Sequence, residues 1–234
     1  LNLAQNENEV TRLSNDVFTM DKILLGDVFI RGGSSSGTHV LEEGRPIGQF
    51  YGLVCNGIDE NGRYIMVDKD GDGEISDPAD YDYIGSAQPK LTYGITNTFR
   101  YKNFDLSFFL RGTIGNDILN ATRMAYAQSG FLPGTNALDD PLTYTLSETP
   151  RFSNYYLEKG SFMRLDNLTL GYKIKALNGI RVYFTAQNLF VITKYKGLDP
   201  EVPMDSGDGL TPGVEPREFY PKARTFSVGL NLNF

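Results

Sequence analysis

The chain has 234 residues, of which 40% are hydrophobic, and a formal net charge of −7 at pH 7. This acidic balance argues against nucleic-acid binding, which requires a basic surface, and no apolar run approaches the ~18 residues of a membrane-spanning helix. The single cysteine, Cys55, excludes an internal disulfide, and together with the lone His39 it forms no zinc-binding set. We expect both residues to be structural rather than catalytic.

The first predicted strand covers residues 1–13, where a few apolar side chains stand among Asn, Gln and Glu. Residues 14–90 follow as a long loop rich in Gly and Asp without sustained periodicity, with short β-like pieces at 28–30, 50–54 and 64–67. A loop of this length is uncommon inside a compact domain and is usually functional where it occurs.

Strict alternation of apolar and polar residues begins at residues 91–101 and continues at 104–113. Successive side chains of a strand point to opposite faces, so each segment has one apolar and one polar face. The two-residue connection at 102–103 predicts a hairpin. Charged residues on the polar face suit a water-filled interior better than a packed core; they are Arg100, Asp105 and Arg111.

The second half of the chain repeats this organisation. A second long loop, 114–160, contains a predicted short helix within 118–128. Strands are predicted at 162–174 and 180–192, joined by a tight turn that contains Asn178-Gly179. A third long loop, 193–222, precedes a final strand at 224–234, in which apolar residues occupy every second position.

Long and short connections alternate along these six predicted strands. Long loops follow the first, third and fifth strands, and short turns follow the second and fourth. Outer-membrane barrels place short turns on the periplasmic side and long loops outside, whereas a soluble sandwich has no reason to sort its loops in this way. We therefore predict an all-β fold, a transmembrane antiparallel β-barrel. Six strands are fewer than the ~8 of the smallest barrels, so we expect further strands upstream of Leu1 in a longer protein.

One metal-binding motif stands out in the first long loop. Residues 68–76 match the first nine positions of an EF-hand calcium loop, with carboxylates at positions one, three and five and a Gly at position six. Position twelve is Ala79 instead of Glu, and Asp77 or Asp80 is expected to substitute. No amphipathic helix flanks the motif, so the expected role is a structural calcium ion; the alternative is a solvated Asp/Gly turn without an ion. The predicted ligands are Asp68, Asp70, Asp72, Glu74 and Asp80.

Enzyme motifs are absent, and we expect no catalytic activity. The aromatic residues of the long loops are interpreted mainly as loop-core or membrane-girdle residues, with sugar binding as the alternative; they are Tyr51, Tyr126, Tyr155 and Tyr156. The second functional hypothesis is a secreted, calcium-stabilised β-domain that binds carbohydrate as an adhesin or lectin.

A series of different short motifs is distributed over essentially the whole chain. They are residues 44–52 (GRPIGQFYG), 68–75, 101–107 (YKNFDLS), 160–165, 167–172, 187–190, 193–195, 197–201 and 220–221. Together they resemble the C-terminal barrel region of the SusC/RagA-like TonB-dependent outer-membrane transporters of Bacteroidetes. Asp70 departs from the pattern, since the family commonly carries Asn there; a further carboxylate would strengthen cation binding.

The resemblance implies a 22-stranded barrel with an N-terminal plug, of which residues 1–234 are the last strands. It implies uptake of glycans or peptides across the outer membrane, with a SusD-like surface lipoprotein as partner and TonB bound through an N-terminal region absent from this chain. The implied surroundings are outer-membrane lipid. The final strand also fits the pattern read by the barrel assembly machinery, through Ser227, Gly229, Leu232 and Phe234. The transported substrate and its contacts are left open.

Overall fold

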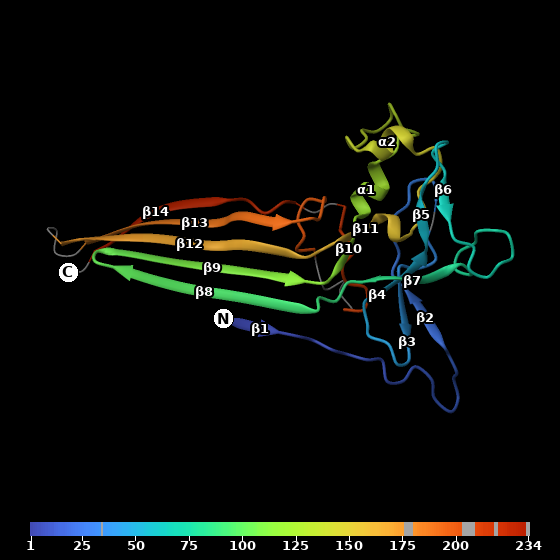
Figure 1. Cartoon of the computed structure of the whole chain (residues 1–234), viewed down its shortest axis with the longest axis horizontal. Coiled ribbons are helices and arrows are strands. Elements are labelled where there is room, and N and C mark those ends of the chain that lie inside the picture. The colour runs from blue at the N-terminus through green and yellow to red at the C-terminus, as the bar shows by residue number, and fades with distance from the viewer. Residues whose placement is uncertain (34, 176–179, 203–208, 218–219, 233–234) are drawn as a thin grey trace.

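The computed structural model describes residues 1–33, 35–175, 180–202, 209–217 and 220–232. It consists of a long antiparallel sheet at one end and a cap of shorter strands and helices at the other (Figure 1). The chain crosses between these two parts several times. The cap is built from the segments that connect the long strands.

Six strands form the long sheet, in the order β1-β8-β9-β12-β13-β14, with every pair antiparallel. They are β1 (Asn2–Ala4), β8 (Leu91–Tyr101), β9 (Phe104–Ile114), β12 (Phe162–Ile174), β13 (Ile180–Thr193) and β14 (Thr225–Asn231). Four of these strands have 11 to 14 residues, which is long enough to cross a bilayer at a tilt.

The register places the apolar side chains on one face of the sheet. One row across five strands pairs Tyr101 with Phe104, Tyr172, Val182 and Leu230. Many of these side chains are exposed: Tyr101 by 70% and Leu230 by 62%. An exposed apolar face of this extent is unfavourable in water and marks a surface that is covered by lipid or by another protein.

The opposite face carries Thr, Ser, Asn, Gln and charged residues. Near the turn end, Arg181 on β13 reaches across β12 to Asp105 on β9, with distances of 2.9 Å from Nε to Oδ1 and 2.5 Å from Nη2 to Oδ2. The guanidinium passes over Gly171, where a Cβ atom would lie 2.4 Å from Nη2. The absence of a side chain at Gly171 therefore makes room for this ion pair.

A bulge interrupts the register in the loop-side half of β12 and β13. Against β9, Asp166 is an extra residue between Leu165 and Asn167. Against β13, Asp166 faces two residues, Asn188 and Leu189, and Asn188 has a left-handed φ of 51°. Bulges bend a strand and redirect its side chains. Here the bulge directs the polar groups of Asp166 and Asn188 to the polar face, where both contact arginines.

The cap corrects the prediction that residues 14–90 form an irregular loop. A four-stranded sheet runs in the order β2-β3-β4-β7, and a separate hairpin pairs β5 with β6. These strands are β2 (Lys22–Leu25), β3 (His39–Glu42), β4 (Gln49–Leu53), β5 (Cys55–Ile58), β6 (Tyr64–Met66) and β7 (Tyr81–Ser86). The β-like pieces at 50–54 and 64–67 coincide with β4 and β6, whereas residues 28–30 contribute buried side chains without forming a strand.

The second long loop is also folded. It contains β10 (Asp117–Leu119), α1 (Ala121–Tyr126), α2 (Pro141–Thr145), a 3-10 turn (Asn154–Tyr156) and β11 (Leu157–Lys159). Side chains cap both helices: Asn120 accepts from the Arg123 backbone at 2.8 Å and Asp140 from Leu142 at 2.9 Å. Such caps satisfy backbone donors that a short helix leaves free.

A shared hydrophobic core joins the first two loops into the cap. Half-buried Val214 from the third loop packs against it, and backbone hydrogen bonds tie Leu119 to Gly213 and Glu215. Burial of this apolar area is the main force that holds the cap together. The core residues are Val28, Ile30, Phe50, Ala87, Leu119, Ala121, Met124, Ala127, Leu142, Phe152 and Tyr156.

The first predicted strand, 1–13, is wrong in extent, because β1 ends at Ala4. Residues 5–9 are all polar and offer no alternating apolar face. The segment instead bonds to the cap: Val10 N donates to Arg45 O at 2.8 Å, and Ile47 N donates to the Asn8 side chain at 2.9 Å. The other strands match their predicted bounds within a few residues. The predicted turn at 176–179 lies outside the described residues.

Gly112 is expected to be essential for the pairing of β9 with β12. A Cβ atom there would lie 2.0 Å from the backbone oxygen of Phe162, which cannot move without breaking the ladder. We predict that Gly112→Ala in the full-length protein costs about 1–3 kcal/mol, measured as a lower unfolding midpoint in detergent. Gly94→Ala on β8 is the matched control, since its Cβ would meet only the Phe109 ring at 3.2 Å. Equal midpoints for the two variants would contradict this reading of the sheet.

Candidate functional site

The acidic loop between β6 and β7 brings together three of the five predicted calcium ligands. Carboxylate oxygens of Asp68, Asp70 and Asp80 all lie within 4.8 Å of one another. Asp72 and Glu74 lie outside this cluster, and each takes part only in the local turn. Of the two residues expected to substitute at position twelve, Asp80 lies near Asp68 and Asp70, whereas Asp77 pairs with Arg151 at 2.6 Å.

Backbone hydrogen bonds shape this loop around its carboxylates. Asp68 accepts from the amides of Gly71 (2.6 Å) and Gly73 (2.9 Å), and Asp80 accepts from Lys69 (2.6 Å) and Ser76 (2.7 Å). Gly71 and Gly73 have left-handed φ values of 78° and 89°, which glycine adopts without steric cost. The loop is therefore preformed by its own sequence.

The electrostatics of the loop favour a cation. A hydrogen bond from the Asp72 amide would lower the pKa of Asp70, but burial and the carboxylates of Asp72, Asp80 and Asp68 raise it on balance. Hydrogen bonds from the amides of Ser76 and Lys69 hold the pKa of Asp80 below its ordinary value. Several hard oxygens on a tight turn are the ligand set that calcium takes, so the residues present fit this ion.

A second cluster of charges, missed by the sequence analysis, lies on the polar face of the long sheet. We call it the ion cluster; it comprises Arg111, Arg164, Asp166, Asp199, Glu201 and Lys222. Its centre is Arg164 of β12, whose side chain is 2% exposed and donates to Asp199 (5% exposed) at 2.6 Å. Arg164 also contacts the side chain of Asn188 and lies 3.5 Å from Glu201.

Glu201 connects the rest of the ion cluster. Arg111 of β9 donates to both of its carboxylate oxygens, and Lys222 donates to one of them. Burial would raise the pKa of Glu201, but the hydrogen bonds from Arg111 and Lys222 hold it below its ordinary value. The stabilisation from this carboxylate is therefore present above the ordinary glutamate pKa of ~4.3 and is lost as the pH falls through the lowered value.

The ion cluster fixes the third long loop against the sheet. Residues 195–202, which we call the strap, are held through Asp199 and Glu201. Residues 222–223, just before β14, are held by the Asn188 amide, which donates to the backbone oxygens of Lys222 (2.9 Å) and Ala223 (3.2 Å). The sequence indicates the ion cluster only weakly. It shows arginines on two strands and, in a distant loop, two acidic residues separated by one proline.

The final strand presents the residues of the predicted assembly signal on both faces. Ser227 and Gly229 lie on the polar face of β14, paired with Thr185 and Tyr183. The Tyr183 ring covers Gly229, where a Cβ atom would come within 2.3 Å of Cζ. Leu232 is 50% exposed, and Phe234 lies outside the described residues.

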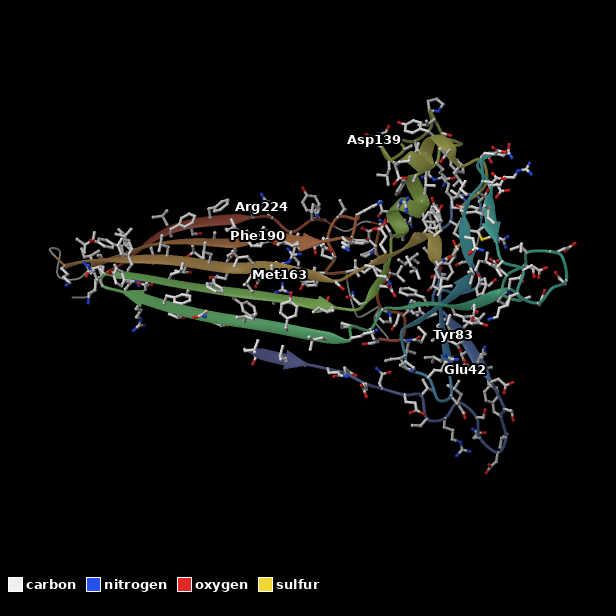
Figure 2. All side chains as sticks on the ribbon, in the orientation of Figure 1. Glu42, Tyr83, Asp139, Met163, Phe190 and Arg224 are labelled. Atoms are coloured by element: carbon white, nitrogen blue, oxygen red, sulfur yellow. The ribbon has the colours of Figure 1, made fainter. Side chains whose placement is uncertain are left out.

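The aromatic residues of the loops divide into core and surface positions. Tyr156 is fully buried, its hydroxyl lies 2.5 Å from that of Tyr64, and burial raises the pKa of Tyr156 to about 12. Tyr51 packs edge-on against Tyr83, with ring centroids 5.1 Å apart. Figure 2 shows Tyr83 and Glu42 in the lower part of the cap and Asp139 at its opposite tip. His39 and Cys55 are buried in the cap.

The buried Arg164–Asp199 pair generates a prediction for the full-length protein. Arg164→Met leaves Asp199 buried without its cation and should cost about 3–5 kcal/mol of stability, measured by thermal unfolding in detergent. Combining it with Asp199→Leu removes the orphaned charge and should restore part of the loss. The control is Arg12→Met, whose pair with Asp16 is 3.9 Å long and exposed, so no measurable change is expected. A small effect of Arg164→Met would show that the strap is held by other contacts.

None of the helices in the described ranges is long and apolar enough to cross a membrane. No family model matches the chain. Curated relatives do match over its full length: TonB-dependent receptor SusC of Bacteroides thetaiotaomicron at 35% identity and TonB-dependent receptor P3 of Formosa agariphila at 32%. The chain spans about a quarter of the length of these relatives, 24% and 26% respectively.

Solved structures agree with these relatives. The RagAB peptide transporter matches 97% of the chain with a TM-score of 0.72 at 25% identity, and its closed-closed state gives the same values. In each case the chain covers 26% of the neighbour. These similar proteins are receptors and transporters rather than enzymes, and they do not favour the secreted adhesin or lectin. The chain belongs to the SusC/RagA-like TonB-dependent receptors of the Bacteroidetes outer membrane and matches part of their β-barrel.

Proposed function

We propose that the chain is the C-terminal part of a plugged, 22-stranded barrel that imports glycans or peptides across the outer membrane. The observation that carries this proposal is the six-stranded sheet with one exposed apolar face and one polar face, in a chain that matches SusC over its full length. The apolar face contacts lipid, and the polar face lines the lumen. The cap and its loops lie on the outer side, and the short turn at 102–103 lies on the periplasmic side.

The partners of the whole protein follow from the same proposal. A SusD-like surface lipoprotein covers the mouth of the barrel on the side of the cap. TonB supplies energy through an N-terminal region that is not part of this sequence. The name of the RagAB peptide transporter supports a two-component importer, and that of SusC supports the receptor family.

Uptake by the full-length protein tests the import function. Cells that express it with its lipoprotein should accumulate labelled oligosaccharides or peptides from a mixed library, and the same cells without TonB should not. Measuring the label inside the cells after washing gives the answer. Uptake that is independent of TonB would contradict the proposal. So would the absence of any uptake above that of cells that lack the full-length protein.

Calcium in the acidic loop is proposed as a structural ion that holds residues 68–80 in place. The supporting observation is the convergence of Asp68, Asp70 and Asp80. We predict that Asp70→Ala lowers the calcium content of the purified protein by one equivalent in elemental analysis, because it removes one of three converging carboxylates. Glu74→Ala is the matched control, since Glu74 lies outside the cluster, and it should retain the ion. Unchanged calcium content in Asp70→Ala would remove the site.

The final strand is proposed as the signal for the barrel assembly machinery. Removing the aromatic ring in Phe234→Ser should lower the amount of full-length protein in the outer membrane more than it lowers the stability of the fraction that inserts. Immunoblotting of outer-membrane fractions measures the first quantity, and thermal unfolding measures the second. Normal membrane levels of Phe234→Ser would refute this role.

A further inference from the structure

A cleft of about 270 Å³ lies between the strap and the polar face of the long sheet. Its floor is a register row across three strands, in which Thr92 pairs with Thr113 and Thr113 pairs with Phe162. Pro200 and Glu201 of the strap form the opposite wall. The strand ladder fixes the floor, and the ion cluster fixes the opposite wall. The cleft is therefore preformed.

The lining of this cleft combines hydrogen-bonding groups with apolar surface. Hydroxyls come from Thr92 and Thr113, and a carboxamide comes from Asn116, which is 4% exposed. The Asn116 side chain is oriented by the hydroxyl of Thr113, which donates to it at 3.1 Å. Phe162, 6% exposed, adds an aromatic wall. A few positioned polar groups among apolar side chains are typical of small-molecule sites.

The cleft offers no net charge to a ligand. Its two charged residues, Arg111 and Glu201, are paired with each other. A ligand with a free carboxylate or ammonium would have to break this pair, which is costly at a partly buried site. A neutral ligand can accept from the guanidinium and donate to the carboxylate without separating them.

A sugar ring has the surface that this lining complements. Its hydroxyls both donate and accept, as the threonine, asparagine, arginine and glutamate groups do, and its C–H face packs against aromatic and proline rings. The volume lies just below the range of ~300–1,000 Å³ for drug-sized ligands, so it suits one ring rather than an extended chain. We propose that this cleft binds one unit of a neutral saccharide at the outer end of the lumen. The proposal rests on the import function and adds the ligand class to it.

Other clefts in the described residues fit this role less well. One of about 680 Å³ is bounded by residues 5–9, which directly follow the edge strand β1, so neighbouring strands of a longer barrel would change its shape. A cleft of about 230 Å³ beside α1 is lined by five charged residues and would favour a charged ligand; they are Arg123, Asp139, Asp140, Lys196 and Glu215.

Saturation-transfer NMR on the full-length protein in detergent tests the proposal. The probes are maltose, lactose and mannobiose, with an N-acetylated, amidated tripeptide as the neutral peptide probe. The variants are Thr92→Val and Asn116→Leu. Thr98→Val is the matched control, because it is an exposed threonine on the same face of β8 outside the cleft. A shift in electrophoretic mobility after the sample is heated shows that each variant was folded before heating.

At least one sugar should give saturation transfer to the wild-type protein. Thr92→Val should weaken its apparent affinity about threefold to tenfold, as expected for one lost hydrogen bond, and Thr98→Val should leave it unchanged. Asn116→Leu should weaken it at least as much. No signal from any sugar, equal effects of Thr92→Val and Thr98→Val, or a tripeptide signal in place of a sugar signal would overturn the assignment. Uptake without sugar binding contradicts only the cleft, whereas binding without uptake contradicts only the import function.

Discussion

The structure depends on one constraint: every backbone amide and carbonyl within the hydrocarbon layer must be hydrogen-bonded inside the protein. The long strands meet it through an antiparallel ladder with one bulge at Asp166, and β8, β9, β12 and β13 each have partners on both sides. The ladder leaves only the side chains to distinguish lipid from water, so apolar and polar residues must alternate strictly. The two edge strands, β1 and β14, have one partner each in this sheet, which agrees with a segment that covers a quarter of its relatives.

The same constraint explains where irregular structure occurs. Bulges and glycines sit on the strands where a polar group must be redirected or a large side chain must pass, as at Asp166 and Gly171. The ion cluster then joins the outer half of the sheet to the strap, which comes from a loop more than 30 residues away in sequence. Because the Arg164–Asp199 pair is buried and hydrogen-bonded, it holds the strap in one place, and the cleft beneath it has a defined shape. The cap adds its own hydrophobic core on the outer side.

Period-two alternation made the long strands predictable, since each needs only local sequence to specify its two faces. β8 has the predicted bounds, and β9, β12 and β13 differ by at most one residue. The cap strands were mostly missed because they are only three to six residues long. In β3, for example, three consecutive residues are buried, so the sequence shows no alternation of apolar and polar residues there. The ion cluster and the absence of Asp72 from the acidic cluster depend on contacts between distant residues or on the path of a turn. Spacing alone does not determine either.

Site-directed labelling across one strand tests the central claim, that the apolar face of the long sheet faces lipid and the polar face a water-filled lumen. In the full-length protein with Cys55 replaced by Ala, single cysteines at residues 167–170 and 172 of β12 would carry nitroxide labels in lipid nanodiscs. Collision rates with oxygen, which concentrates in lipid, and with a water-soluble nickel complex would be measured at each position. The account predicts higher oxygen accessibility at Leu168, Leu170 and Tyr172, and higher nickel accessibility at Asn167 and Thr169. Equal accessibility along the strand, or the opposite alternation, would contradict it.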